Sequence, residues 1–227
     1  MKFLLDSSPR LVNMKKDHPL VAGQLLTPLT RYHNWGGPFA IDNGCFKRFL
    51  RDRFEGVLRR EQERDYDVLP NCLFVTCPDV VGNARRTREL WIRRHSFVSK
   101  FDSRWADRLA LVAQDGIEDS DIPWDEFTWI FIGGRDPWKD SQASQDIVRT
   151  AKTLNKFVHV GRVNDPDRWE RFAELGADTC DGSGVSKHAR GDDQFLRVVE
   201  RAAAFYKVPR IDLNEFRIQD ILEKLIR

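Results

Sequence analysis

Short apolar runs recur along this chain, and nearly every one ends in a polar residue or a glycine. The runs are short enough to be buried strands. If the strands are parallel, their carboxyl ends gather at one edge, which in a (β/α) barrel is the mouth where catalytic groups lie. The pattern predicts a pocket of three carboxylates, an amide and backbone N–H groups, suited to a polar planar base and a cationic transition state. The residues at the ends of these runs are Asp42, Asp79, Gln114, Gly133, Gly134, Gly161 and Asp181.

The order of the runs and of the segments between them predicts an α/β fold. Alternating strands and helices imply βαβ units with right-handed crossovers. We expect a compact TIM-type (β/α)8 barrel that forms one domain over 1–227, with an open doubly wound sheet as the alternative. A Gly-x-Gly-x-x-Gly after the first strand and a Gly-Lys-Ser/Thr loop are both missing, which disfavours nucleotide-binding versions of the open sheet. The expected strands are 1–6, 39–41, 73–77, 109–113, 129–132, 157–160 and 178–181, with 21–26 as an eighth candidate; the expected helices are 46–64, 83–100, 140–154, one beginning at 164–166, 192–206 and 214–226.

Composition indicates a globular protein with one core. The chain has 227 residues, of which 41% are hydrophobic and 32% charged, values that exclude a disordered chain. No apolar stretch approaches the roughly 20 residues that span a bilayer, and the N-terminus has no signal-peptide pattern. The four cysteines show no metal-binding spacing and no disulfide framework. We therefore expect a cytoplasmic protein with reduced thiols, no membrane partner and no metal.

The net charge is only +2, but the basic residues are clustered. One cluster falls within 47–64 and another, which includes Arg85 and Arg86, within 85–94. Two interpretations remain open: these segments are solvated helix faces with i,i+4 ion pairs, or they are basic helices that border the mouth and hold phosphates. A second candidate site for phosphates is the Gly/Ser loop 182–184 with the basic residues that follow it, Lys187, His188 and Arg190.

Two of the aspartates have both a structural and a functional interpretation. Asp42 either caps the following helix or transfers protons, with Phe46 offering a ring on which a base stacks. Asp79 either caps the helix that begins near Asn83 or accepts the ring N–H and exocyclic amino hydrogens of a guanine, because an ionised carboxylate only accepts hydrogen bonds.

Complementary donors and a further acid follow the later strands. The Gln114 amide and the free N–H of a glycine in the Gly133-Gly134 pair are suited to donate to a base carbonyl, and glycines allow close backbone approach; a simple loop turn is the alternative for the glycine pair. Gly161 follows the apolar run 157–160, and we expect it to be one of the substrate-binding residues. Side chains alternate along a strand, so Asp178 and Asp181 point to opposite faces. We expect Asp181 to face the mouth and Asp178 to make a structural bond.

At five places in order, over residues 38–184, the sequence resembles the tRNA-guanine transglycosylase superfamily, TIM-barrel enzymes that exchange a guanine for a 7-deazaguanine. Asp42-Asn43-Gly44-Cys45-Phe46 is similar to the family's Asp-Ser-Gly-Gly-aromatic motif, and Asp79 to its guanine-recognising Asp. Gln114 and Gly133-Gly134 resemble the Gln and the Gly-Gly that contact the base. The segment 176–181 resembles Gly-Ile-Asp-x-x-Asp, whose final acid is the nucleophile. The resemblance thus implies that Asp181 is a nucleophile and Asp42 a general acid/base.

The chain departs from the tRNA enzymes in two ways. First, it is shorter. Second, no cysteine follows Cys180, so the zinc site that follows the nucleophile in those enzymes is missing. Docking of tRNA and a zinc-linked dimer, which depend on that site in the tRNA enzymes, are therefore not expected here. In both respects it resembles the DNA-acting branch, which inserts 7-deazaguanines such as preQ0 into viral or bacterial DNA. The resemblance implies a DNA-guanine transglycosylase with DNA and a preQ0-type base as partners and no cofactor, in the host cytoplasm if the chain is viral. The alternatives are a related enzyme acting on RNA, a hydrolytic base glycosylase, and a nucleic-acid-binding subunit without catalysis.

Overall fold

Eight parallel strands close into a barrel in the computed structural model, which describes residues 1–6, 16–29, 34–46, 48–64, 67–182 and 200. Each strand pairs with the next in sequence, and β8 pairs with β1 through Lys2–Thr179 and Phe3–Cys180. The predicted TIM-type barrel is therefore confirmed, and the open sheet is excluded. The strands are β1 (Lys2–Leu5), β2 (Val21–Leu26), β3 (Phe39–Ile41), β4 (Cys72–Thr76), β5 (Leu109–Ala113), β6 (Trp129–Ile132), β7 (Phe157–Val160) and β8 (Thr179–Cys180).

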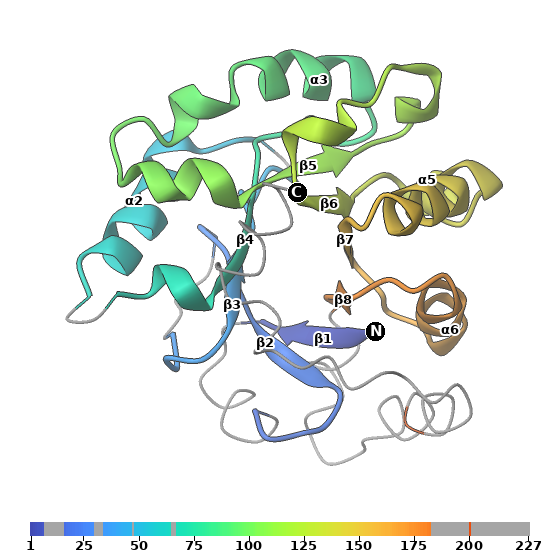
Figure 1. Ribbon diagram of the computed structural model, residues 1–227, viewed down its shortest axis with the longest axis horizontal. Helices are drawn as coiled ribbons and strands as arrows, with labels where there is room; N and C mark the ends of the chain where they lie inside the picture. The colour runs from blue at the N-terminus through green and yellow to red at the C-terminus, as the bar shows by residue number, and fades with distance from the viewer. Residues whose placement is uncertain (7–15, 30–33, 47, 65–66, 183–199, 201–227) are drawn as a thin grey trace.

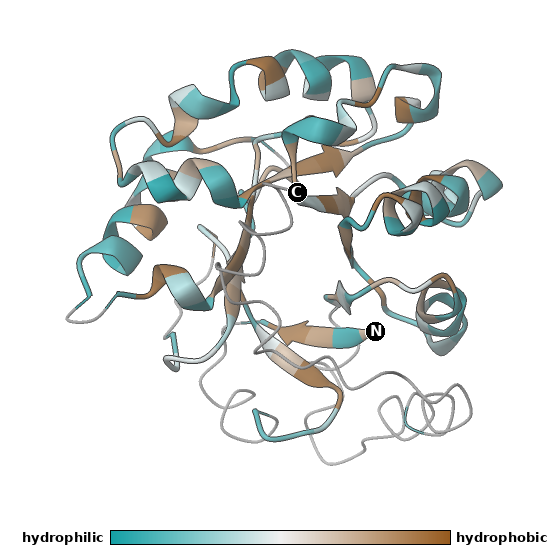
Figure 2. Cartoon of the chain, viewed as in Figure 1, coloured by the Kyte–Doolittle hydropathy of each residue, from teal (hydrophilic) through white to brown (hydrophobic). Residues whose placement is uncertain are grey.

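Helices lie outside the ring of strands (Figure 1). The strands are predominantly apolar, whereas the helices carry polar residues on much of their surface (Figure 2), as expected for amphipathic helices that cover a barrel. No helix in the described ranges is long and apolar enough to cross a membrane. The α-helices are α2 (Arg51–Gln62), α3 (Ala84–Ile92), α4 (Asp136–Lys139), α5 (Gln142–Thr153) and α6 (Pro166–Glu174); the 3-10 helices are η1 (Leu69–Asn71), η2 (Arg94–Phe97), η3 (Ser103–Arg108), η4 (Ile117–Asp119) and η5 (Trp124–Glu126).

Several helix boundaries differ from the prediction. The helix expected over 46–64 begins only at Arg51, because the turn after β3 carries Phe46 to the barrel mouth. The helix expected over 83–100 ends at Ile92 and is followed by η2. Six residues advance an α-helix by about one and two-thirds turns, which would point Phe97 away from the side that buries Trp91. The change to a 3-10 turn lets both side chains be buried. The helices expected at 192–206 and 214–226 lie outside the described residues.

Alternation along the strands separates the core into two clusters. The larger cluster packs between the strands and the helices, and the three tryptophans Trp91, Trp105 and Trp169 are fully buried there. The smaller cluster fills the barrel interior and includes Ala40, Phe74, Ala110 and Trp129. Residues two or four positions further along these strands also point inward, and at the carboxyl ends they are polar. This alternation places Asp42, Thr76 and Gln114 at the barrel mouth.

Candidate active site

A pocket opens at the carboxyl ends of the strands. Its volume is about 110 Å³. Because one water molecule needs roughly 10–15 Å³, the pocket has room for a small ligand and not just one water. All residues predicted to catalyse or to bind the base line this one pocket. They are Asp42, Phe46, Asp79, Gln114, Gly133, Gly134, Gly161 and Asp181, and the structure adds Asn43, Cys45, Lys139, Arg162 and four apolar side chains.

Asp42 follows β3 and lies near two other carboxylates. The N-cap of α2 is Leu50, so Asp42 does not cap the following helix and the structural alternative is wrong. Burial, together with repulsion from Asp79 and Asp181, raises the pKa of Asp42 to about 7, although hydrogen bonds from the Gly44 backbone and the Thr76 hydroxyl oppose the shift. A carboxyl group that titrates near neutral pH can both donate and accept a proton there.

Asp79 is buried and held by amide side chains. Its Oδ1 accepts a hydrogen bond from Asn43 Nδ2 at 2.8 Å, and its Oδ2 accepts one from Gln114 Nε2 at 2.6 Å. Asn83, not Asp79, caps α3 by accepting from the backbone N–H of Arg86 at 3.0 Å. Burial raises the pKa of Asp79, and the hydrogen bonds from Asn43 and Gln114 lower it. The Cys45 thiol also donates to this carboxylate. A thiol is a weak donor and each carboxylate oxygen has two lone pairs, so Asp79 keeps acceptor capacity for a ligand.

The amide of Gln114 has a fixed orientation. Its Oε1 accepts from Gly82 N–H at 2.8 Å and from Gly134 N–H at 3.1 Å, which leaves Nε2 facing Asp79 and the pocket. The Gly134 N–H is therefore already used within the protein, and the Gly133 N–H donates to the carbonyl of Ala113 at 2.9 Å. The expectation of a free glycine donor is therefore wrong for both residues. Gly133 is required beside the amide, because a Cβ there would lie 2.6 Å from Gln114 Nε2 and 2.9 Å from Val112 Cγ1.

Asp181 follows β8, and two donors hold one of its oxygens. His159 Nε2 and the backbone N–H of Arg162 each lie 3.1 Å from Oδ1. Oδ2 accepts no hydrogen bond from the part of the chain that the structure describes. The side chain of Asp181 is 22% exposed. One oxygen is thus fixed by the protein, and the other is available to a ligand.

His159 is completely buried beneath the pocket. Its Nδ1 lies 2.9 Å from Thr179 Oγ1, and its ring packs on Phe131 with centroids 4.6 Å apart. Burial lowers the pKa of His159, although the hydrogen bond to Asp181 opposes this. The imidazole is therefore neutral near pH 7, with one nitrogen donating and the other accepting.

Lys139, at the end of α4, points into the same region. Its side chain is fully buried, and Nζ donates to the carbonyl of Gly161 at 2.5 Å. Burial, with the nearby guanidinium of Arg162, lowers the pKa of Lys139 to about 8, while Asp181 opposes the shift. An ammonium has three donors, and within the described residues one of these three has a partner. The pocket therefore contains a cation beside Asp181.

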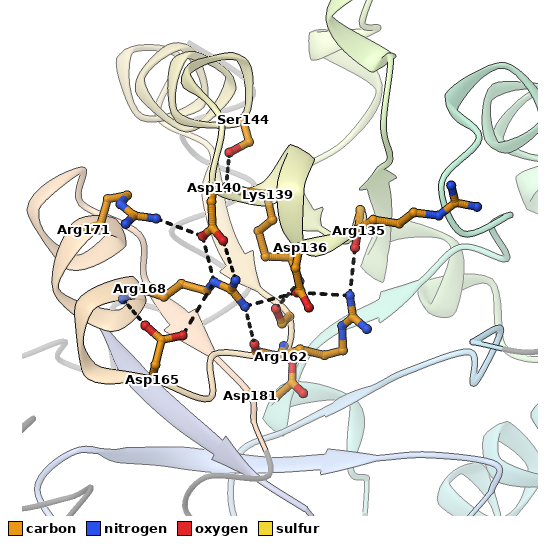
Figure 3. A network of polar contacts seen from close by, with 12 residues as sticks. Arg135, Asp136, Lys139, Asp140, Ser144, Arg162, Asp165, Arg168, Arg171 and Asp181 are labelled. Carbon is orange, nitrogen blue, oxygen red and sulfur yellow. Dashed lines mark hydrogen bonds and ion pairs between the residues drawn. The ribbon is translucent and has the colours of Figure 1, made fainter.

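An ion-pair network supports this side of the pocket (Figure 3). Arg168 Nη2 donates to Asp140 at 2.6 Å, and its Nη1 donates to Asp136 and to the carbonyl of Arg162, both at 3.2 Å. Arg162 Nη2 donates to the Gly134 carbonyl at 3.1 Å. The network ties the loop after β7 to α4 and α6, and so fixes the backbone N–H that contacts Asp181.

Phe46 lies at the rim of the pocket and is 60% exposed. The guanidinium carbon of Arg162 lies 5.2 Å from the centre of its ring. An exposed ring beside a pocket is a stacking platform for a planar ligand, and this position matches the predicted role of Phe46.

The structure separates the other predicted residues into three groups. Asp178 makes the structural contacts expected of it, since its Oδ2 accepts from Lys152 Nζ and from the backbone N–H of Val158, both at 2.7 Å. Arg85 and Arg86 are exposed on the first turn of α3, at the mouth end of the barrel; Arg85 lies 3.6 Å from Glu89. Lys187, His188 and Arg190 lie outside the described residues.

The sequence analysis gave no role to His159, which lies beneath the pocket, or to Lys139 and Arg162, which line it. His159 is detectable by alternation, because it lies two positions before Gly161 and therefore faces the barrel interior. Lys139 and Arg162 are at the ends of elements whose relative placement depends on tertiary packing, and no local pattern identifies them.

Comparisons with known proteins add no assignment. No family model matches the chain, and no curated protein matches it significantly. In the described ranges, no group of three or more His, Cys, Asp or Glu side chains is arranged to hold a metal ion, and the four cysteines are free thiols. The functional argument therefore depends on the pocket and on the motif resemblance.

Proposed function

We propose that the protein is a base-exchanging transglycosylase that replaces guanine in DNA with a preQ0-type 7-deazaguanine through a covalent aspartyl–glycosyl intermediate. The observation that carries the proposal is the convergence of Asp42, Asp79 and Asp181, from three strand ends, on one pocket. The three acids have different environments: Asp42 titrates near pH 7, Asp79 is held between two amides, and Asp181 has one oxygen exposed to the pocket. Different environments suit different chemical roles.

The pocket provides a recognition edge for guanine. The remaining lone pairs of Asp79 accept the N1–H and the exocyclic amino group, and the second hydrogen of Gln114 Nε2 donates to O6. In this proposal Gln114 takes the role first assigned to the Gly134 N–H, because that N–H already donates to Gln114. Phe46 provides the stacking face. A base inside a duplex must be extruded to reach the pocket, which costs a few kcal/mol.

The first chemical step releases guanine. Oδ2 of Asp181 attacks C1′ of the deoxyribose and forms a C–O bond while the C1′–N9 bond breaks. The bonding electrons leave with the base, which takes up the proton held by Asp42. The carboxylate of Asp181 also stabilises the oxocarbenium-like transition state. Lys139 contributes a positive charge beside Asp181.

The second step reverses the first with a different base. The 7-deazaguanine occupies the vacated pocket, and Asp42 removes the proton from its N9. The resulting anion attacks C1′, the C–O bond to Asp181 breaks, and Asp181 returns to its carboxylate form. Two displacements at C1′ give net retention of configuration, and the proton on Asp42 is restored.

The test uses DNA and RNA that carry labelled guanine, each incubated with and without a preQ0-type base. We expect label release from DNA, retention of the new base, and a covalent protein–DNA adduct with wild-type protein. Release from RNA in its place would assign the reaction to RNA, and abasic product without base incorporation would indicate a hydrolytic glycosylase.

Substitution of Asp181 tests directly whether this residue is the nucleophile. Asp181→Asn is expected to abolish both guanine release and the adduct. The matched control is Asp178→Asn, just before β8, whose side chain turns away from the pocket; this variant should lose stability but retain exchange. Normal exchange by Asp181→Asn would refute the assignment, and wild-type protein that binds DNA without an adduct would indicate a non-catalytic subunit.

A further inference from the structure

We propose that His159 is a positioning residue that, with Thr179, distinguishes the two oxygens of Asp181, so that Oδ2 attacks the sugar and Oδ1 carries the ester carbonyl in the intermediate. This inference rests on the proposed function. It assigns a role to a buried histidine that has no substrate contact of its own.

The hydrogen-bond pattern fixes one tautomer of His159. Asp181 is a carboxylate that can only accept, so the nitrogen facing it, Nε2, must carry the hydrogen. Nδ1 then has a lone pair and accepts from the hydroxyl of Thr179 at 2.9 Å. The register of the barrel supports this pair, because His159 of β7 lies directly beside Thr179 of β8. The hydroxyl of Thr179 therefore donates to His159, and His159 donates to Asp181.

The surroundings hold the imidazole in one place. Its ring lies between Phe74, at a centroid distance of 5.1 Å, and Phe131, at 4.6 Å. An apolar enclosure that lowers the pKa of His159 keeps the ring neutral, so it acts as a hydrogen-bond donor and not as a charge. Lys139 supplies the positive charge beside Asp181.

Both donors reach the same carboxylate oxygen. His159 Nε2 and the N–H of Arg162 each lie 3.1 Å from Oδ1, and Figure 3 shows Asp181 directly beneath the Arg162 backbone. Arg162 adopts a φ of 57°, in the left-handed region that an arginine rarely occupies. A backbone strained in this way and a buried histidine that meet at one oxygen indicate a site built to orient that carboxylate.

The arrangement has a specific consequence for the second step. After Oδ2 has bonded to C1′, Oδ1 is the carbonyl oxygen of a glycosyl ester and still faces both N–H groups. When the incoming base displaces the ester, negative charge returns to the carboxylate, and the two donors stabilise it as it forms. Removing one donor of this kind slows a reaction by about 10²- to 10³-fold. We therefore expect the loss of His159 to slow breakdown of the intermediate more than its formation.

The test compares His159→Phe with His159→Gln. Phenylalanine fits the aromatic surroundings but has no donor, whereas glutamine can place an amide N–H near the position of Nε2. With the labelled DNA and a preQ0-type base, His159→Phe should release about one equivalent of guanine per enzyme and then turn over about 100-fold more slowly than wild type. Because formation of the adduct is not slowed, kcat/KM for DNA should stay unchanged and KM should fall together with kcat. Its covalent adduct should accumulate, and His159→Gln should restore most of the turnover.

A second pair of variants gives the same information without altering the imidazole. Thr179→Val removes the hydroxyl that fixes the tautomer and should lengthen the adduct lifetime by about 10-fold, whereas Thr179→Ser should behave as wild type. This pair decides the question if His159→Phe does not fold.

The outcomes separate this inference from the proposed function. Wild-type protein that forms no adduct would overturn both. If the wild type forms the adduct, three results would overturn the positioning role alone: normal turnover by His159→Phe, equal slowing of both steps, or His159→Gln as impaired as His159→Phe.

Discussion

Gln114 donates a 2.6 Å hydrogen bond to Asp79 and thereby connects the carboxyl ends of β4 and β5. The carbonyl end of the same amide accepts from two backbone N–H groups, those of Gly82 and Gly134. The side chain therefore has a structural role in three loops and, in the proposed reaction, a recognition role towards the base.

Replacement of Gln114 by methionine should affect both roles. Two backbone N–H groups lose their acceptor, and each unsatisfied group costs about 1–3 kcal/mol when buried. Since the pocket is partly open, we expect the free energy of unfolding to fall by about 2 kcal/mol, measured by urea denaturation. Gln142→Met, at an exposed position at the start of α5, is the matched control. Equal stability of the two variants would contradict the structural role.

Asp42 should make the protein less stable as pH rises. Its pKa in the folded protein is about 7, above the usual 3.8, so between these values the folded state binds more protons than the unfolded state. The stability that Asp42 contributes is therefore greatest below pH 4 and is lost as pH rises through 7. Asp42→Asn, which has no charge to bury, should be a few kcal/mol more stable than wild type at pH 8 and similar to it at pH 4.

The measurement for Asp42 is the free energy of unfolding of both proteins between pH 4 and pH 8. A difference that does not grow with pH would show that Asp42 titrates normally. Base exchange by Asp42→Asn should also fall by about 10²- to 10⁴-fold, as expected for the loss of a general acid/base.

Phe46 should affect substrate binding without affecting stability. The ring is 60% exposed, so little buried area is lost in Phe46→Ala, and the unfolding transition should stay within about 0.5 kcal/mol of wild type. Stacking of a base on an aromatic ring contributes about 1–3 kcal/mol, so KM for DNA should rise by about 5- to 150-fold. Phe46→Tyr keeps the ring and should retain binding. An unchanged KM in Phe46→Ala would remove the ring from the base site.

Arg85 and Arg86 should contribute to the salt dependence of DNA binding. Both are exposed on the first turn of α3, at the mouth end of the barrel. If each contacts one phosphate, the double alanine variant should reduce the slope of log K against log salt by about 1.8. The matched control replaces Arg59 and Arg60 in the last turn of α2, at the opposite end of the barrel. A similar loss in both double variants would indicate a general charge effect and not a specific phosphate contact.

The sequence predicts the barrel and most of the pocket because both depend on local patterns. Alternation along the strands and the polar residue at each strand end place Asp42, Gln114 and Asp181 at one mouth, and they do line one pocket. The helix boundaries are less accurate, since the end of α3 at Ile92 is determined by the burial of Trp91 and Phe97 against the barrel.

The parts of the site that the sequence does not predict depend on distances between elements. Lys139 reaches the Gly161 carbonyl only because α4 begins shortly after β6 and its last residue lies against the loop after β7. Arg162 contacts Asp181 through its backbone, which no pattern of side chains can indicate. The occupied Gly134 N–H is a similar case, because its partner is 20 residues away in the sequence.

The left-handed conformation of Arg162 has a consequence for engineering the protein. A glycine would adopt this conformation without strain, yet it would remove the guanidinium that lies beside Phe46 and reaches the Gly134 carbonyl. Selection for thermal stability alone would therefore favour glycine, which has no side chain to contact Phe46 at the pocket rim. Stabilisation of this barrel is best sought at the ends of its helices, leaving the corner after β7 untouched.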